Sequence, residues 1–181
     1  MMMNATAPVA GRRAALAAVL LVPLLLGVGG LIAQASGSVE DNLWYQSLAL
    51  PVLQPPGPVF GIAWSILYTL LALSAALVVG VRADGGLARL KRQALWLFGI
   101  GMVINWTWSP VFFLLHRIDV ALAIIVVMLG VALLTLLAFA RLSRVAAGLM
   151  LPYIAWLMFA AGLNAAIWQM NPVADVAQIG V

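Results

Sequence analysis

The side chains in this sequence that are best suited to recognising a small molecule are aromatic rings and uncharged amides. The chain holds seven tryptophans, three tyrosines and six phenylalanines. Aromatic rings bind flat apolar molecules by stacking and apolar burial, and a few amides orient such a ligand through hydrogen bonds. The composition therefore favours non-covalent binding of a hydrophobic molecule.

Groups that carry covalent or acid–base chemistry are scarce. The chain has no cysteine, which excludes disulfides, thiolate metal sites and cysteine nucleophiles. Its one histidine, His116, cannot assemble a histidine metal cluster, and its place at the end of an apolar segment favours an interfacial or capping role. No acid–base pair lies inside the apolar segments, so we predict neither catalytic residues nor a metal site.

The overall composition is that of an integral membrane protein. Hydrophobic residues make up 66% of the 181 residues and charged residues 8%, and the mean hydropathy is +1.15. A soluble domain carries about 25% charged residues, so this chain is neither a soluble enzyme nor a disordered chain. The net charge of +4 comes from scattered basic residues, which excludes a nucleic-acid-binding stripe.

Segments without charge divide the chain into five spans. Each is long enough to supply the roughly 20 residues that cross a bilayer, and lipid requires helices because it offers no partner to unpaired backbone amides. We predict one domain over residues 1–181, an all-α bundle of five transmembrane helices at about 14–33, 58–81, 93–115, 120–140 and 148–170.

The first span has a second interpretation. Arg12-Arg13, the apolar run and Ala33-Gln34-Ala35 resemble a signal peptide with its cleavage site. The run is longer than a usual signal core, however, and it contains Gly27, Gly29 and Gly30, which suit close helix packing. A retained helix is therefore favoured over a cleaved one.

The basic residues predict the orientation. Two precede the first span, four lie between the second and third spans, and two lie between the fourth and fifth, whereas Arg117 is alone on the other side. Because basic loops remain in the cytoplasm, we predict a cytoplasmic N-terminus and an outer C-terminus. An all-helical chain with this bias favours the bacterial inner membrane.

The longest predicted loop covers about residues 35–57, on the outer side. It contains Trp44-Tyr45, Pro51, Pro55 and Pro56. Proline fixes φ and disfavours helix just before its ring. We therefore expect a stiff, non-helical cover at the mouth of the bundle.

The tryptophans fall into two groups by depth. Trp44, Trp96 and Trp168 lie near span ends, where an interfacial belt is expected. Four others lie deeper, where packing between helices and lining of a cavity are equally open: Trp64, Trp106, Trp108 and Trp156.

Helical spacing gathers aromatic and amide residues into three stripes, because residues three, four or seven apart share a helix face. The stripes are Phe60, Trp64 and Tyr68; Asn105, Trp108, Ser109 and Phe112; and Tyr153, Trp156, Ala160 and Asn164. A lipid-facing stripe does not need asparagine, whose amide must find partners in hydrocarbon. The stripes predict a mainly aromatic pocket, with an interhelical hydrogen bond as the alternative role of each asparagine.

Four motifs accompany these stripes. They are Trp44-Tyr45-x-x-Leu48-x-x-Pro51; Pro55-Pro56-Gly57-x-Val59-Phe60-Gly61-x-x-Trp64-x-x-Leu67-Tyr68; Asn105-x-x-Trp108-Ser109-Pro110-x-Phe112-Phe113; and Leu151-Pro152-Tyr153-x-x-Trp156-x-x-Phe159-Ala160-x-x-Leu163-Asn164. In this order, in a five-span chain, they resemble the TspO/MBR family, the tryptophan-rich sensory proteins related to the mitochondrial translocator protein.

The resemblance implies a pocket beneath the first loop, porphyrin binding and a homodimer. Trp64 and Trp156 match the family's porphyrin-binding tryptophans, and the motifs add further ligand-binding positions: Pro55, Pro56, Phe60, Tyr68, Asn105, Trp108, Tyr153 and Asn164. A tetrapyrrole, either a porphyrin or haem, is thus expected as a ligand and not as a resident cofactor. Membrane lipid and a second copy of the chain are the other expected partners, and nucleic acid is not.

Three positions depart from the residues that are usual in this family. Leu53 stands where Trp or Phe is usual, Pro58 where Trp is frequent, and Gly101 where Gln is usual. Each departure removes an aromatic face or an amide from the predicted pocket.

Three functions remain open at this stage. The first is a membrane receptor or sensor for a flat hydrophobic molecule, with a tetrapyrrole preferred. The second is a porphyrin-degrading enzyme that acts by photo-oxidation at tryptophan. The third is a transporter of tetrapyrroles or other lipophilic molecules, although the intramembrane carboxylates of ion-coupled transporters are missing from the sequence.

Overall fold

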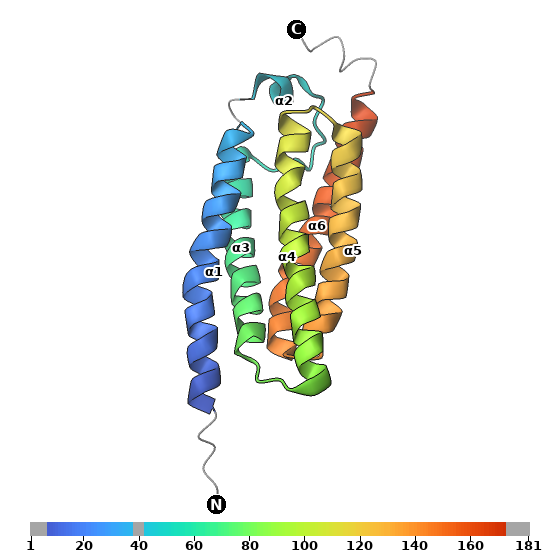
Figure 1. The fold of residues 1–181 in the computed structure, drawn as a ribbon. Helices are drawn as coiled ribbons and strands as arrows, with labels where there is room; N and C mark the ends of the chain where they lie inside the picture. The colour runs from blue at the N-terminus through green and yellow to red at the C-terminus, as the bar shows by residue number, and fades with distance from the viewer. Residues whose placement is uncertain (1–6, 38–41, 173–181) are drawn as a thin grey trace, which may run out of the picture.

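The computed structural model describes residues 7–37 and 42–172, and these contain helices and connecting segments but no strand. Five of the six helices are long and apolar enough to cross a membrane, which confirms the predicted five-span all-α bundle. The helices are α1 (Ala7–Ala35), α2 (Leu43–Ser47), α3 (Gly57–Gly80), α4 (Gly85–Phe113), α5 (Ile118–Ala140) and α6 (Arg144–Met170) (Figure 1).

Some helices extend beyond the predicted spans at their basic ends. α4 begins at Gly85 instead of residue 93, and α6 at Arg144 instead of residue 148. Absence of charge marks the part of a helix in hydrocarbon, whereas the helix itself continues until a cap or turn stops it. Ser143 caps α6, because its Oγ accepts a hydrogen bond from the backbone N–H of Ala146 at 3.2 Å.

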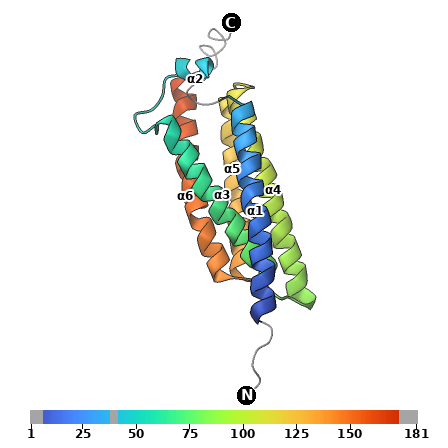
Figure 2. The same ribbon diagram turned by 90° about the vertical axis from the view of Figure 1, so that its left-hand side faces the viewer.

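The five long helices form a ring whose order differs from their order in the chain. α1 packs mainly against α3, α3 against α6, α6 against α5, and α5 against α4, which also contacts α1. Figures 1 and 2 show the start of α1 at one end of the bundle and α2 at the other. The end of α6 lies beside α2, so chain segments far apart in the sequence meet at that end.

Residues 42–56, here called the cap, only partly match the predicted cover. The prediction of a wholly non-helical loop is wrong over α2, because the Oδ1 atom of Asn42 accepts the Tyr45 backbone N–H at 2.9 Å and starts a short helix. From Leu48 to Pro56 the chain is non-helical, as its prolines predict. Residues 38–41, which belong to the same predicted loop, lie outside the described residues.

The cap is fixed to the bundle by buried rings and by hydrogen bonds, of which Asn171 makes two. Trp44 and Tyr45 are buried, and their ring centroids lie 5.6 Å and 6.1 Å from that of Phe112 on α4. Asn171, just past α6, accepts the Ala49 N–H at Oδ1 and donates from Nδ2 to the Ala49 carbonyl, both at 2.9 Å. These two hydrogen bonds pair the backbone N–H and carbonyl of Ala49 and hold the cap on the end of α6.

The interfacial position predicted for Trp44 is wrong. Its ring is only 8% exposed, and it stacks on His116 with a centroid distance of 4.2 Å, because the cap turns the ring inward. Trp96 and Trp168 are 69% and 43% exposed, so both remain accessible to an interface. Their place in an aromatic belt stays a prediction.

One glycine determines how closely α1 approaches α3. A Cβ atom built at Gly29 would overlap the ring of Tyr68, whereas Gly27 and Gly30 have nothing within 4 Å. The prediction of close packing through small residues is therefore confirmed for Gly29 alone. The α1–α3 contact needs a residue without a side chain at this single position.

This packing predicts that Gly29→Ala lowers the free energy of unfolding by about 1–3 kcal/mol. The Tyr68 ring cannot move away from an added Cβ atom without breaking the hydrogen bond of its hydroxyl to Asn105 on α4. Thermal unfolding of the purified protein in detergent measures the effect. Gly27→Ala is the matched control and is expected to be neutral or to stabilise by up to about 1 kcal/mol, since alanine favours helix. Equal midpoints for the two variants would contradict this role of Gly29.

Candidate ligand-binding cavity

A cavity of about 630 Å³ lies inside the bundle beneath the cap. Its walls come from α1, α3, α4 and α6, and Tyr45 and Gln54 of the cap contribute to its lining. The volume lies in the usual range of about 300–1,000 Å³ for small-molecule sites. The structure therefore places a cavity where the sequence predicts a pocket.

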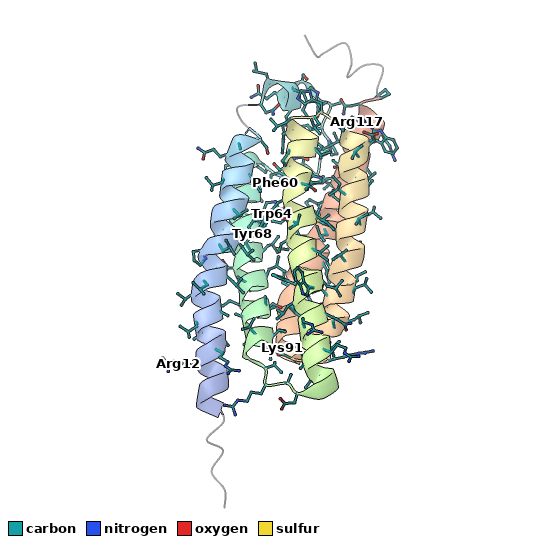
Figure 3. All side chains as sticks on the ribbon, viewed as in Figure 1. Arg12, Phe60, Trp64, Tyr68, Lys91 and Arg117 are labelled. Carbon is teal, nitrogen blue, oxygen red and sulfur yellow. The ribbon has the colours of Figure 1, made fainter. Side chains whose placement is uncertain are left out.

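The stripe on α3 lines this cavity in full. Phe60, Trp64 and Tyr68 follow one another at four-residue spacing, from the cap end toward the middle of the bundle (Figure 3). The rings of Trp64 and Tyr68 lie 5.1 Å apart between centroids. Four-residue spacing stacks side chains along one helix face, which is the reason that the sequence locates this wall.

The stripe on α4 also lines the cavity in full. Asn105, Trp108, Ser109 and Phe112 are all on the wall, and Trp108 stacks on Phe112 with centroids 5.1 Å apart. Trp106 belongs to the wall as well, so of the two roles that the sequence left open, helix packing and cavity lining, it has the second. Aromatic rings from α3 and α4 therefore form two walls of one space.

The stripe on α6 divides between the wall and the packing behind it. Ala160 and Asn164 line the cavity, whereas Tyr153 and Trp156 do not. Trp156 packs edge-to-face on Trp64 at 6.3 Å and on Phe60 at 5.9 Å. Trp156 therefore supports the α3 wall from behind, and Tyr153 is buried deeper in the core.

The two prolines predicted as site residues are also off the wall. Pro55 and Pro56 are absent from the cavity lining, although their neighbours Gln54 and Gly57 belong to it. The prolines shape the chain before α3, and the adjacent residues reach the cavity.

The two asparagines of the stripes, Asn105 and Asn164, are buried and make hydrogen bonds between helices. Asn105 Oδ1 accepts the Tyr68 hydroxyl at 2.7 Å, and its Nδ2 donates to the Tyr153 hydroxyl at 3.2 Å. Asn164 Nδ2 donates to the Ile118 carbonyl at 2.8 Å, and its Oδ1 accepts the Trp108 indole N–H at 3.4 Å. The interhelical role left open by the sequence is thus present, and the same two amides line the cavity.

The cavity lining is electrically neutral. It contains no lysine, arginine, aspartate, glutamate or histidine, and its titratable residues are tyrosines. Burial raises the pKa of Tyr45 in the cap, more than its hydrogen bond with Gln54 lowers it, so this phenol stays neutral at physiological pH. Among the described residues no group of three acidic, histidine or cysteine side chains could hold a metal ion.

Comparison with known proteins identifies the family. The sequence profile of the TspO/MBR family matches residues 15–169, which include every residue of the cavity lining. The chain belongs to the TspO/MBR family.

Its relatives include bacterial and animal proteins of similar length. Protein CrtK of Rhodobacter capsulatus is 33% identical over 141 residues, which cover 77% of this chain and 86% of that protein. The tryptophan-rich sensory protein of Cereibacter sphaeroides is 34% identical over 146 residues, or 81% of this chain and 88% of the relative. The translocator protein of Bos taurus is 32% identical over 150 residues, or 83% and 88%.

Two of the three departures from the usual TspO/MBR residues lie away from the cavity. Leu53 is exposed on the cap, and Gly101 faces α5, where an added Cβ would lie 3.3 Å from Val131 Cγ1. Neither residue lines the cavity, whereas Pro58 does. The aromatic walls built by α3 and α4 are therefore complete despite the substitutions at 53 and 101.

The α1 wall was missing from the sequence-based site. Leu26, Gly29, Gly30 and Ala33 line the cavity, but small and aliphatic residues resemble any lipid-facing helix in a sequence. The glycines were the one available indication, since they predicted close packing of this helix. Gln54 and Tyr45 were also missed as lining residues, because the fold of the cap brings them there.

The asparagine network predicts that Asn105→Leu destabilises the bundle by about 1 kcal/mol or more. Leucine has the branched shape of asparagine with a somewhat larger volume, but it leaves the buried hydroxyls of Tyr68 and Tyr153 without their amide partner. Thermal unfolding in detergent is the measurement. Thr107→Ala on the same helix is the control, because Thr107 is exposed and bonds within its own helix turn.

A double-variant cycle checks that the loss arises from the hydrogen bond. Adding Tyr68→Phe to Asn105→Leu is expected to cost less than the sum of the single changes, because the bond can be lost only once. Strict additivity would show that the two residues act independently.

Proposed function

We propose that this TspO/MBR protein is a membrane receptor or sensor for a flat hydrophobic ligand, and that the ligand is a tetrapyrrole. The observation that carries the proposal is the cavity with aromatic rings on two of its walls, from Phe60 and Trp64 on α3 and from Trp106, Trp108 and Phe112 on α4. Such walls offer stacking faces to a flat ring system. The names of the relatives, a sensory protein and a translocator protein, support a role in signalling or handling of small molecules.

The same proposal includes an orientation in the bacterial inner membrane. Arg12 and Lys91 lie at the end of the bundle opposite the cap, as Figure 3 shows, and the positive-inside rule assigns that end to the cytoplasm. The cap and the cavity then face the outer side. Membrane lipid surrounds the bundle, and a homodimer is the proposed assembly.

The cavity supports binding better than acid–base catalysis. Its polar side chains are amides, hydroxyls and indoles, and the two asparagines already have hydrogen-bond partners. General acid–base chemistry needs groups that titrate near the working pH, and the lining offers none.

The proposal predicts that Trp64→Ala weakens porphyrin binding by about tenfold or more, since it removes one stacking face and its apolar contact. The measurement is a titration of the protein in nanodiscs with protoporphyrin IX, followed by quenching of tryptophan fluorescence. Trp96→Ala is the matched control, because Trp96 is exposed and lies outside the cavity lining. Equal affinity of Trp64→Ala and the unsubstituted protein would exclude this cavity as the porphyrin site.

One contact favours porphyrin photo-oxidation as a second candidate function. Trp64 faces the cavity and its ring lies 6.3 Å from Trp156, so a Trp64 that gives an electron to a photoexcited porphyrin can regain one from a second indole, with dissolved oxygen as the final oxidant of the porphyrin. This function predicts light-dependent breakdown of bound protoporphyrin IX by the purified protein, reduced in Trp156→Phe while binding is retained. Absorption spectra before and after illumination measure it, and breakdown at the same rate in Trp156→Phe would remove the role of this pair.

A further inference from the structure

A tight turn in the cap carries two exposed apolar side chains at its tip. The turn covers residues 51–54, here called the cap turn, and is closed by a hydrogen bond from the Gln54 backbone N–H to the Pro51 carbonyl at 2.9 Å. Val52 and Leu53 hold its two central positions and are 103% and 77% exposed. Turns that face water are built mainly from glycine, proline, asparagine, aspartate and serine, so two aliphatic side chains at the tip indicate an apolar neighbour.

The composition of the cap permits contact with lipid. No lysine, arginine, aspartate, glutamate or histidine occurs from residue 42 to residue 56, and the nearest charged residues in the sequence are Asp41 and Arg82. By contrast, the short connections at the other end of the bundle carry Arg82, Asp84 and Arg141. Charged side chains are the costly ones to place in a bilayer, and the cap has none.

The cap turn lies beside the start of α3. Figure 2 shows that the chain between α2 and α3 descends from α2 and bulges outward next to the first turns of α3. The 24 residues of α3 rise about 36 Å, whereas the hydrocarbon core of a bilayer is about 30 Å thick. The start of α3 therefore falls at the level of the lipid headgroups, and the cap turn precedes it directly in the chain.

The exposed apolar face of α3 continues up to the cap turn. Val59, Ile62 and Ile66 are exposed, and their spacing of three and four residues puts them on one helix face. Because α3 is one of the helices that can cross a membrane, this face contacts lipid. The surface in contact with lipid thus begins within the first turn of α3, a few residues after Val52 and Leu53.

The cap turn has few attachments of its own to the long helices. Ala49, just before it, is held by Asn171 at the end of α6. Within the turn, Gln54 makes the side-chain hydrogen bond, and it stays inside the cap, because Gln54 Nε2 donates to the Tyr45 hydroxyl. Gln54 and Tyr45 both line the cavity, so movement of the turn would move part of the cavity cover.

We propose that the cap turn inserts Val52 and Leu53 into the bilayer leaflet at the cap end, and that this contact with phospholipid holds the cover of the cavity in place. The partner is the membrane itself, and the attraction is the burial of apolar surface at the boundary between headgroups and acyl chains. This attachment of the cap does not depend on which ligand the cavity binds.

The absence of cysteine from the chain allows a direct test with single spin labels. The full chain with Leu53→Cys is labelled with a nitroxide and reconstituted in phosphatidylcholine nanodiscs. Electron paramagnetic resonance then compares collisions of the label with oxygen, which concentrates in lipid, and with nickel ethylenediaminediacetate, which stays in water. We expect oxygen collisions to dominate, as they should for Ile62→Cys on the lipid-facing side of α3.

Leu43→Cys is the matched control for this measurement. Leu43 is as exposed and apolar as Leu53, but it lies on α2, which Figure 2 shows beyond the start of α3. Collisions with nickel should dominate there. The same water-exposed pattern at Leu53 would overturn the proposal. A Leu53 label shielded from both reagents would also overturn it, because protein, such as a second copy of the chain, would then cover the turn.

A second measurement tests whether lipid holds the cap. The double variant Val52→Asp, Leu53→Asp places two charges on the turn and should expel it from the leaflet. We expect hydrogen exchange of the backbone amides in residues 42–56 to become about threefold faster or more in nanodiscs, since the cap loses one attachment. Leu43→Asp is the control and should leave exchange unchanged. Equal exchange rates in the double variant and the unsubstituted protein would show that lipid does not hold the cover.

Discussion

The structure depends on the need of buried polar groups for partners inside an apolar bundle. Tyr68 on α3, Asn105 on α4 and Tyr153 on α6 satisfy one another, with bonds of 2.7 Å and 3.2 Å. Hydrocarbon offers these groups no alternative partner, so the three helices are held in one relative arrangement. Tyr68 and Asn105 are the lining residues farthest from the cap on their helices, so the network that joins the helices also forms the floor of the cavity.

Two further contacts maintain the space above this floor. Gly29 lets α1 lie directly against the Tyr68 ring, which closes the side of the cavity between α1 and α3. At the other end, Asn171 holds the cap through both backbone groups of Ala49, and Trp44 is buried beneath it. Two walls are mainly aromatic, and among residues 7–37 and 42–172 charged side chains occur at the opposite end of the bundle or in the Arg117–Asp119 ion pair.

Much of the candidate site was predictable because it follows helical periodicity. Phe60, Trp64 and Tyr68 lie at i, i+4 and i+8, and the Asn105 stripe has equally regular spacing, so both walls are visible in the sequence. On α6 helical periodicity identified the helix face that is turned to the other stripes, but not which residues of that face line the cavity. Tyr153 shares that face with Asn164 but lies at the level of the cavity floor, where it bonds Asn105, and Trp156 packs on Phe60 and Trp64 instead of lining the space. Periodicity gives a direction around the helix axis and no information on where along it a space opens.

The sequence by itself determined the membrane class, the five helices, the family and the separation of basic residues from the aromatic stripes, because these follow from composition, helical period and motif order. Only the tertiary structure decided the α1 wall, the inward turn of Trp44, the short helix α2 and the pairing of the asparagines. Each of these depends on which side chain from a distant segment arrives at a given point. Packing between helices is a property of pairs of residues far apart in the chain, and no local pattern of one helix records its partner.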